Sequence, residues 1–171
     1  MKQEELDIIL ENHGKWLFNE GGDRADLSNA DLKNTNLRFA NLRLADLRGA
    51  DLSYANLRFA NLSNADLSYA NLRFANLSNA DLSYANLSNV NLNWVNWQHV
   101  EGLTVICVQV DTTRKNNQIA YIKELDIWIT GCFQGTLDEL KASVEQTHGD
   151  NEKLRKRYYR VIDFILKEVA E

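Results

Sequence analysis

Residues 50–69 have the sequence ADLSY-ANLRF-ANLSN-ADLSY, in which one five-residue pattern occurs four times in succession. Leucine stands at the centre of each unit, alanine stands two positions before it, and Asp or Asn lies between them. The pattern continues in both directions, because leucine recurs at every fifth position from Leu27 to Leu92 and Trp97 takes the fifteenth. An internal repeat of this length decides the architecture of residues 25–102 before any secondary structure is assigned.

A five-residue period is incompatible with a continuous helix and with a straight strand. Five helical steps leave successive leucines about 140° apart around the helix axis. In a strand, side chains alternate between two faces, so leucines five residues apart would fall on opposite faces. The chain must therefore turn a corner in every unit. The leucine and the small residue two positions before it point inward, and the other three positions point outward.

This Ala-(Asp/Asn)-Leu-X-X pattern resembles the pentapeptide-repeat family, and the resemblance covers residues 25–102. It implies a mainly β protein built on a right-handed quadrilateral β-helix with four units in each coil. Fifteen units would make about four coils, and the stack would be about 18 Å long at the spacing of paired strands. The sequence contains no proline, so every backbone donor in the tract remains available for a neighbouring coil.

The segment 1–24 is expected to be a helical cap on the first coil. An open solenoid exposes leucines and unpaired backbone at each end, so it needs a cover. Apolar residues and a histidine recur at helical spacing before a double glycine at Gly21 and Gly22. The residues in this pattern are Leu6, Ile9, Leu10 and His13. Residues 15–27 also resemble the leading segment of bacterial and phage pentapeptide-repeat proteins.

The segment 103–171 is expected to form a small α+β domain. Its two β-rich runs, residues 103–110 and 119–129, flank a polar loop at 111–117 and predict a hairpin. The domain resembles C-terminal domains attached to pentapeptide repeats in phage and bacterial proteins.

Two helices are predicted to follow this hairpin. Thr136 and Glu139 form a capping-box pattern for a helix that ends near Gly149, and Asp150 is expected to cap a second helix that extends to Val169.

Outward residues twenty positions apart would stack in columns if each coil holds four units. Two such columns are aromatic, and arginines stand beside them. The residues of this candidate partner surface are Arg38, Phe39, Arg58, Phe59, Tyr54, Phe74 and Trp94. Aromatic and arginine side chains are enriched where proteins bind partners, and aromatic rings also stack on bases. The structural alternative is that the rings pack along the solenoid and that the arginines bridge to the aspartates.

The charge of the repeat tract bears on its partner. The chain carries 24 acidic and 19 basic residues, of which residues 25–102 carry seven and six. Some pentapeptide-repeat proteins imitate DNA and occupy topoisomerases, which requires a strongly negative rod. We therefore expect a scaffold or protein-binding module that can associate with itself, with a DNA-mimicking inhibitor of a nucleic-acid enzyme such as a topoisomerase as the alternative. A protein partner or a homodimer is favoured over nucleic acid.

The sequence favours a non-enzymatic, cytoplasmic protein without a cofactor, a metal or an evident small-molecule substrate. No apolar run could cross a membrane, and the N-terminus lacks the layout of a secretory signal. Cys107 and Cys132, the two cysteines, are expected to be buried thiols in a reducing compartment. In an enzymatic alternative, Cys132 would be the nucleophile and His148 the base.

We expect a bulky or charged residue at Leu57 or at Ala60 to break the coil stack, because both positions point into it. Leu57→Asp would place an unpaired carboxylate among leucines. Thermal unfolding followed by circular dichroism should then show no cooperative transition for the repeat tract. Retention of the wild-type transition would contradict the inward orientation of these positions.

Overall fold

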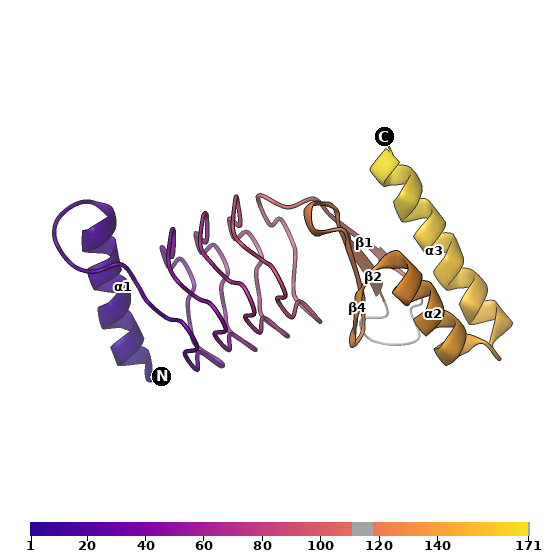
Figure 1. Cartoon of the computed structure of the whole chain (residues 1–171), viewed down its shortest axis with the longest axis horizontal. Coiled ribbons are helices and arrows are strands. Elements are labelled where there is room, and N and C mark those ends of the chain that lie inside the picture. The colour runs from indigo at the N-terminus through magenta and orange to yellow at the C-terminus, as the bar shows by residue number, and fades with distance from the viewer. Residues whose placement is uncertain (111–117, 171) are drawn as a thin grey trace. The chain divides into compact units, whose positions relative to one another are not determined.

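The computed structural model describes residues 1–110 and 118–170, so the predicted loop at 111–117 lies outside the described residues. The chain divides into two compact units, Met1–Leu103 and Thr104–Glu171. The first unit contains helix α1 (Gln3–Leu17) and the repeat tract, whose successive coils are drawn in purple to pink in Figure 1. The second unit contains a sheet and two helices.

Backbone pairing in the repeat tract joins residues that are twenty positions apart. Parallel bridges extend from Asp26 with Asp46 to Asp81 with Glu101. The Leu27 N–H donates to the Asp46 carbonyl at 2.8 Å, and the Asp46 N–H donates to the Ala25 carbonyl at 3.0 Å. Four five-residue units therefore make one coil. Each coil is bonded to the next through its backbone.

The interior of the coils consists of the leucines and of the small residues two positions before them. Every repeat leucine is at most 4% exposed, and Trp97 is 8% exposed. Burying one leucine contributes about 1.5–3 kcal/mol relative to leaving it in water. The predicted inward orientation is thus confirmed for the leucines and, except at the half-buried Ala30, Ala40 and Ala85, for the small residues. The expectation that all other positions are exposed is wrong for four serines, which are buried: Ser53, Ser63, Ser68 and Ser78. The leucine stack is the main apolar core of this unit.

The Asp or Asn before each leucine has a structural role that the sequence pattern alone did not reveal. Its Oδ1 accepts a hydrogen bond from the backbone N–H two residues later, as between Asp26 and Ser28 at 3.0 Å and between Asn56 and Arg58 at 3.2 Å. The same bond occurs in all fifteen units. Asp and Asn make this bond more strongly than Ser or Thr, whose hydroxyl oxygens can also accept it, which accounts for the preference for Asp and Asn at this position.

Each unit ends in a tight turn whose third residue has a left-handed backbone. In the first unit the Ala30 N–H donates to the Leu27 carbonyl at 3.1 Å, and Asn29 between them has φ 56°. This is the pattern of a type II turn, in which Gly and Asn are tolerated best at the third position. Several units instead place a bulky residue there, such as Tyr84 with φ 59°.

Helix α1 satisfies backbone groups at the exposed edge of the first coil. The N-terminal ammonium of Met1 donates to the Asp31 carbonyl at 2.8 Å. The amide of Gln3 both donates to the Asn36 carbonyl and accepts from the Asn36 N–H, each at 3.1 Å. Leu6 is fully buried on the same helix. The open edge thus receives polar partners as well as an apolar cover.

His13 makes the tightest connection between α1 and the first coil. Its Nδ1 accepts the Ala25 N–H at 3.0 Å, so Nε2 carries the hydrogen and donates to the Arg43 carbonyl at 3.0 Å. The ring is fully buried and stacks on Trp16 with centroids 5.6 Å apart. Burial lowers the pKa of His13, and the charge of Arg24 lowers it further, although the Arg43 carbonyl opposes both effects. The neutral imidazole is therefore part of the folded structure.

The second unit has a four-stranded antiparallel sheet in the order β1-β2-β3-β4, not the two-stranded hairpin that we expected. Its strands are β1 (Val105–Gln109), β2 (Gln118–Ile122), β3 (Ile127–Thr130) and β4 (Phe133–Gly135). The predicted run 119–129 is interrupted by a 3₁₀ turn, η1 (Lys123–Leu125), and by Asp126 with φ 49°. These polar residues reverse the chain, so one predicted strand becomes two.

Helices α2 (Leu137–His148) and α3 (Glu152–Ala170) follow the sheet. The capping box at Thr136 is confirmed, since its Oγ1 accepts the Glu139 N–H and its own N–H donates to the Glu139 carboxylate. The predicted cap of the second helix is wrong by one residue. Asn151, rather than Asp150, accepts the Leu154 N–H through its Oδ1 at 3.0 Å.

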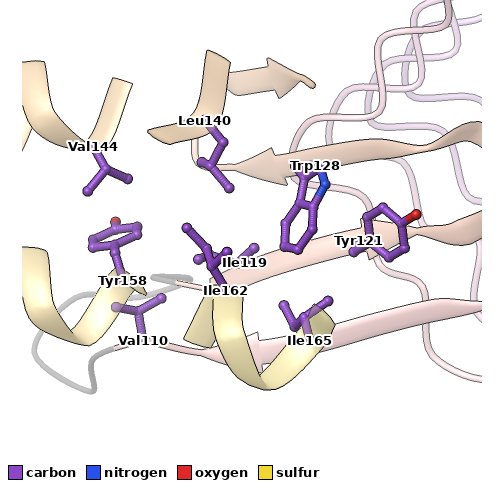
Figure 2. Packing of buried hydrophobic residues seen from close by; sticks show 9 residues of the cluster. All are labelled: Val110, Ile119, Tyr121, Trp128, Leu140, Val144, Tyr158, Ile162 and Ile165. Atoms are coloured by element: carbon purple, nitrogen blue, oxygen red, sulfur yellow. The ribbon is translucent and has the colours of Figure 1, made fainter. Parts of the chain in front are cut away.

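A separate apolar core holds the second unit together. Helix α3 packs on β1 and β2, and α2 packs on β3 and β4. Figure 2 shows the side chains that converge from the strands and the helices onto the space between them. The cluster consists of Val110, Ile119, Tyr121, Trp128, Leu140, Val144, Tyr158, Ile162 and Ile165.

The pH dependence of unfolding should report on His13. A pKa that is lower in the folded than in the unfolded protein means that the unfolded chain binds the extra proton first. The free energy of unfolding should therefore fall as the pH drops below about 6.5, with a slope of at most about 1.4 kcal/mol per pH unit for one proton. Urea denaturation across this range would measure it. His13→Gln keeps a donor and an acceptor but cannot titrate, so an unchanged slope in this variant would contradict the assignment.

The left-handed backbone at Tyr84 gives a second stability prediction. A bulky residue in this conformation costs about 1 kcal/mol, whereas Asn tolerates it, and the Tyr84 side chain is 89% exposed. Tyr84→Asn should thus raise the free energy of unfolding by about 0.5–1 kcal/mol. Tyr84→Ala is the control, because alanine removes the ring without relieving the backbone. Equal stability of the two variants in thermal denaturation would show that the turn stores no strain.

Candidate functional site

The predicted aromatic columns form stacks of parallel rings. Phe39 and Phe59 stack with centroids 5.0 Å apart and 9° between their planes. In the second column, Phe74 lies 4.8 Å from Tyr54 and 5.9 Å from Trp94, again nearly parallel. The rings of a column lie on successive coils, so the spacing between coils holds them at these distances. Their stacking follows from the twenty-residue coil.

Arginine guanidinium groups cover the faces of these rings. The Arg38 guanidinium carbon lies 4.3 Å from the centroid of Phe39 and 5.8 Å from that of Phe59, while Arg58 lies 4.8 Å from Phe59. In the other column, Arg73 lies 4.7 Å from Phe74. These cation–π contacts order the long side chains without consuming the N–H groups at the edge of the guanidinium plane. The guanidinium edges of Arg38 and Arg58 remain suited to carboxylates.

The Arg38, Phe39, Arg58 and Phe59 side chains form the more exposed of the two columns, which we call the Arg-Phe stack. Phe39 is 61% exposed and Phe59 is 38% exposed. In the other column Tyr54 is 57% exposed, whereas Phe74 and Trp94 are half-buried. Large apolar rings at this exposure are the feature that a binding surface requires. Contact of these residues with a partner stays a prediction.

The ring spacing bears on nucleic acid as a ligand. Bases in a stacked strand advance about 3.4 Å per base, so a base inserted between two rings would need them about 7 Å apart. The Phe39 and Phe59 centroids are 5.0 Å apart, and the guanidinium of Arg38 already lies against both rings. The stack is thus closed to intercalating bases and presents ring edges and guanidinium edges instead.

Two further exposed aromatics, Tyr69 and Tyr84, were not among the predicted surface residues. They are 71% and 89% exposed. Residues 53–67 are repeated without change at 68–82, so the copy is shifted by three units rather than by one four-unit coil. Tyr69, the copy of Tyr54, therefore falls on another side of the coil, and Tyr84 lies fifteen residues further along the chain. Neither tyrosine has an aromatic neighbour twenty residues away. The sequence alone already shows this three-unit shift against the four-unit coil.

The residues of the enzymatic alternative lie in different local settings. Cys132 is in the turn between β3 and β4, and His148 is the last residue of α2, where it stacks on Tyr158 with centroids 5.0 Å apart. Both Cys107 and Cys132 are exposed, so the expectation of buried thiols is wrong. Cys107 is exposed because it points away from the core side of β1, on the face opposite Ile106 and Val108.

Neither a metal site nor a membrane span is found in the described part of the chain. Over residues 1–110 and 118–170, no group of three or more His, Cys, Asp or Glu residues could hold a metal ion. Within the same ranges, no helix is long and apolar enough to span a bilayer.

Comparison with known proteins identifies the repeat tract. The family model described as "Pentapeptide repeats" matches residues 25–61 and 60–96, with eight copies. A search of curated proteins finds no match.

Several solved structures are similar to this chain. The alr5209 protein of Nostoc PCC 7120 is 38% identical over 55% of this chain and 72% of its own, with a TM-score of 0.49. HetL of Nostoc sp. strain PCC 7120, a pentapeptide repeat protein involved in heterocyst differentiation regulation, is 36% identical over 47% of this chain and 37% of its own, with a TM-score of 0.46. Rfr23 of Cyanothece 51142 is 42% identical over 44% of this chain and 52% of its own, with a TM-score of 0.44.

The match therefore spans less than two thirds of HetL and of Rfr23, but 72% of alr5209. The fifteen consecutive units, the family model and this identity agree, and they show that the chain belongs to the pentapeptide repeat family.

Proposed function

We propose that this protein is a non-enzymatic binding module that presents one side of its repeat tract to a protein partner. The observation that carries the proposal is the Arg-Phe stack, in which two exposed rings are covered by two guanidinium groups. Its family is generally non-catalytic. Arginine and aromatic residues are the side chains that most often dominate the binding energy of protein interfaces.

The stack is rigid before any partner arrives. Phe39 and Phe59 have φ angles of 62° and 61°, a left-handed conformation that costs about 1 kcal/mol for a bulky residue. The coil holds them there, since the Phe39 N–H donates to the Arg58 carbonyl at 3.1 Å. Side chains that are already ordered lose little entropy on binding, so more of the contact energy is retained as affinity.

The exposed chemistry of the stack indicates the chemistry of the partner. Guanidinium edges donate hydrogen bonds in pairs to carboxylates, and ring edges favour apolar or aromatic contacts. The units that carry the stack, residues 36–39 and 56–59, contain no Asp or Glu. An acidic patch with apolar side chains on another protein is therefore the complementary surface.

The charge balance of the tract favours this proposal over DNA mimicry. A protein that occupies a DNA-binding site must replace a dense row of phosphates. Residues 25–102 carry seven acidic and six basic residues, and two of the bases belong to the Arg-Phe stack itself. The DNA-mimicking inhibitor remains the alternative function, and an experiment can distinguish the two.

We predict that the double variant Arg38→Ala, Phe59→Ala binds the partner at least about tenfold more weakly than the wild type, as expected for two central interface residues. The wild-type protein would be used for affinity capture from its source cells with quantitative mass spectrometry. Each captured protein would then be purified and titrated by calorimetry. The matched control is Arg43→Ala, Tyr84→Ala, which removes one arginine and one exposed aromatic from another side of the coil.

Equal binding of the double variant and the wild type would overturn the proposal and leave the stack as packing within the rod. Loss of binding in the control as well would show that the surface is not specific. Inhibition of DNA supercoiling by gyrase, with no dependence on Arg38 or Phe59, would favour the DNA-mimicking alternative instead.

A further inference from the structure

The four sides of the repeat tract differ in charge, although the tract as a whole is close to neutral. Because each coil has four units, every fourth unit contributes to the same side. The acidic side consists of residues 26–29, 46–49, 66–69 and 86–89, with three aspartates and one arginine. The basic side consists of residues 36–39, 56–59, 76–79 and 96–99, with two arginines and no acidic residue.

The acidic side carries its charge in a single column. Asp26 pairs with Asp46 and Asp46 with Asp66 through backbone bridges, so the three carboxylates follow one another along the rod. Arg48 binds the Asp46 carboxylate, with Nη2 2.5 Å from Oδ2. The remaining negative charge therefore rests on Asp26 and Asp66. Hydrogen bonds from Ser28 lower the pKa of Asp26 further below neutral pH, where an aspartate is already ionised.

The basic side contains the Arg-Phe stack. Arg38 and Arg58 are one coil apart and exposed, and both are ordered over the phenylalanine rings. Asparagines fill the positions that hold aspartates on the acidic side, namely Asn36, Asn56, Asn76 and Asn96. The acidic and basic sides are two units apart in a coil of four units, so two of its four corners separate them. They therefore face opposite directions.

Both charged columns repeat with the same period, because both are set by the coil. Side chains twenty residues apart recur at about the strand spacing of 4.8 Å. Neighbours on one face of a helix lie about 5–6 Å apart, and alternate residues of a strand lie about 6.6–6.8 Å apart. The side of another pentapeptide coil therefore carries its charges on the same period as Arg38 and Arg58, and its carboxylates that Arg48 does not bind, Asp26 and Asp66, are two coils apart.

We infer that the basic side of one copy docks laterally on the acidic side of a second copy. This inference rests on the proposed function and names its partner as another copy of this chain. Arg38 and Arg58 would face the aspartate column, and the phenylalanine edges would lie beside the exposed ring of Tyr69. Two basic sides would bring arginines together, so a symmetric pair through this side is disfavoured. The contact is head-to-tail and leaves both outer sides open for further copies.

The repeat itself supplies a conservative way to remove the aspartate charges. Asn occupies nine of the fifteen positions before the leucines, where its Oδ1 accepts the same backbone hydrogen bond. Asp→Asn at these positions therefore changes the charge while keeping the local structure. Asp26→Asn, Asp66→Asn neutralises the acidic side, and Asp31→Asn, Asp81→Asn removes the same charge from the two other sides.

Sedimentation velocity of the full chain over a range of concentrations tests the inference. In about 50 mM salt the wild type should show reversible growth beyond the dimer, which weakens at about 0.5 M salt because the contact is between exposed charges. Asp26→Asn, Asp66→Asn and Arg38→Gln, Arg58→Gln should each weaken association by about tenfold or more. The controls, Asp31→Asn, Asp81→Asn and Arg43→Gln, Arg73→Gln, should associate like the wild type.

A mixing experiment provides the sharpest outcome. The aspartate variant retains a basic side and the arginine variant retains an acidic side. Each variant should be monomeric alone, whereas an equimolar mixture should form one-to-one pairs. These pairs should not grow further, because the acidic side of one member and the basic side of the other have lost the charges that a third copy would need.

Three results would overturn the inference: a monomeric wild type at low salt, equal loss of association in the control variants, or a mixture that remains monomeric. If the wild type is monomeric while capture still yields an acidic protein that requires Arg38 and Phe59, the proposed function stands and only the identity of the partner is wrong. If no protein of either kind requires these residues, both fail.

Discussion

Backbone hydrogen bonds between successive coils are the constraint on which the repeat unit depends. From Leu27 to Leu82, each repeat leucine N–H donates to a carbonyl nineteen residues later, and the Asp or Asn N–H of the next coil donates back, as Asp46 does to Ala25. These bonds fix four units per coil, and they can form only if every unit turns at the same place. The leucine side chains then point into the coil, and the small residue two positions before each leucine allows the backbone on different sides of the coil to come close together. One repeated pairing therefore determines both the core and the surface.

Only two positions in each unit are left to vary. The Asp or Asn side chain is used to cap the turn, the leucine position is buried in every unit, and the alanine position is buried in most units. The variable residues are those of the turn itself, and the second of them has a left-handed backbone. The aromatic residues of the candidate surface occupy this strained position. Neighbouring coils and covering arginines offset the strain for Phe59, while Tyr84 has no ring in the next coil with which to stack.

Total charge is a poor guide to the surface of such a molecule. Seven acidic and six basic residues suggest a nearly neutral surface, yet these residues are distributed unevenly among the four sides of the coil. Asp26, Asp46 and Asp66 share one column, and Arg38 and Arg58 share the opposite side. The same principle separates the tyrosines of the duplicated segment, because a copy shifted by three units cannot return to the same side. The charge and the exposed rings of a solenoid surface therefore have to be assessed separately for each side of the coil.

The five-residue period determined the repeat fold from sequence alone, because no helix or strand can bury Leu27 and every fifth residue after it on one side. It also placed the ring columns, once four units per coil were assumed from the family resemblance. The second unit was harder to predict from the sequence. The residues around Asp126 were assigned to a single predicted strand, 119–129, whereas the sheet has two strands, β2 and β3, on either side of them.

Only the tertiary structure revealed that His13 accepts the Ala25 N–H, that each Asp or Asn caps its own turn, and that arginines lie over the rings. These contacts join atoms whose distances are set by coil stacking and burial, and a linear pattern contains neither.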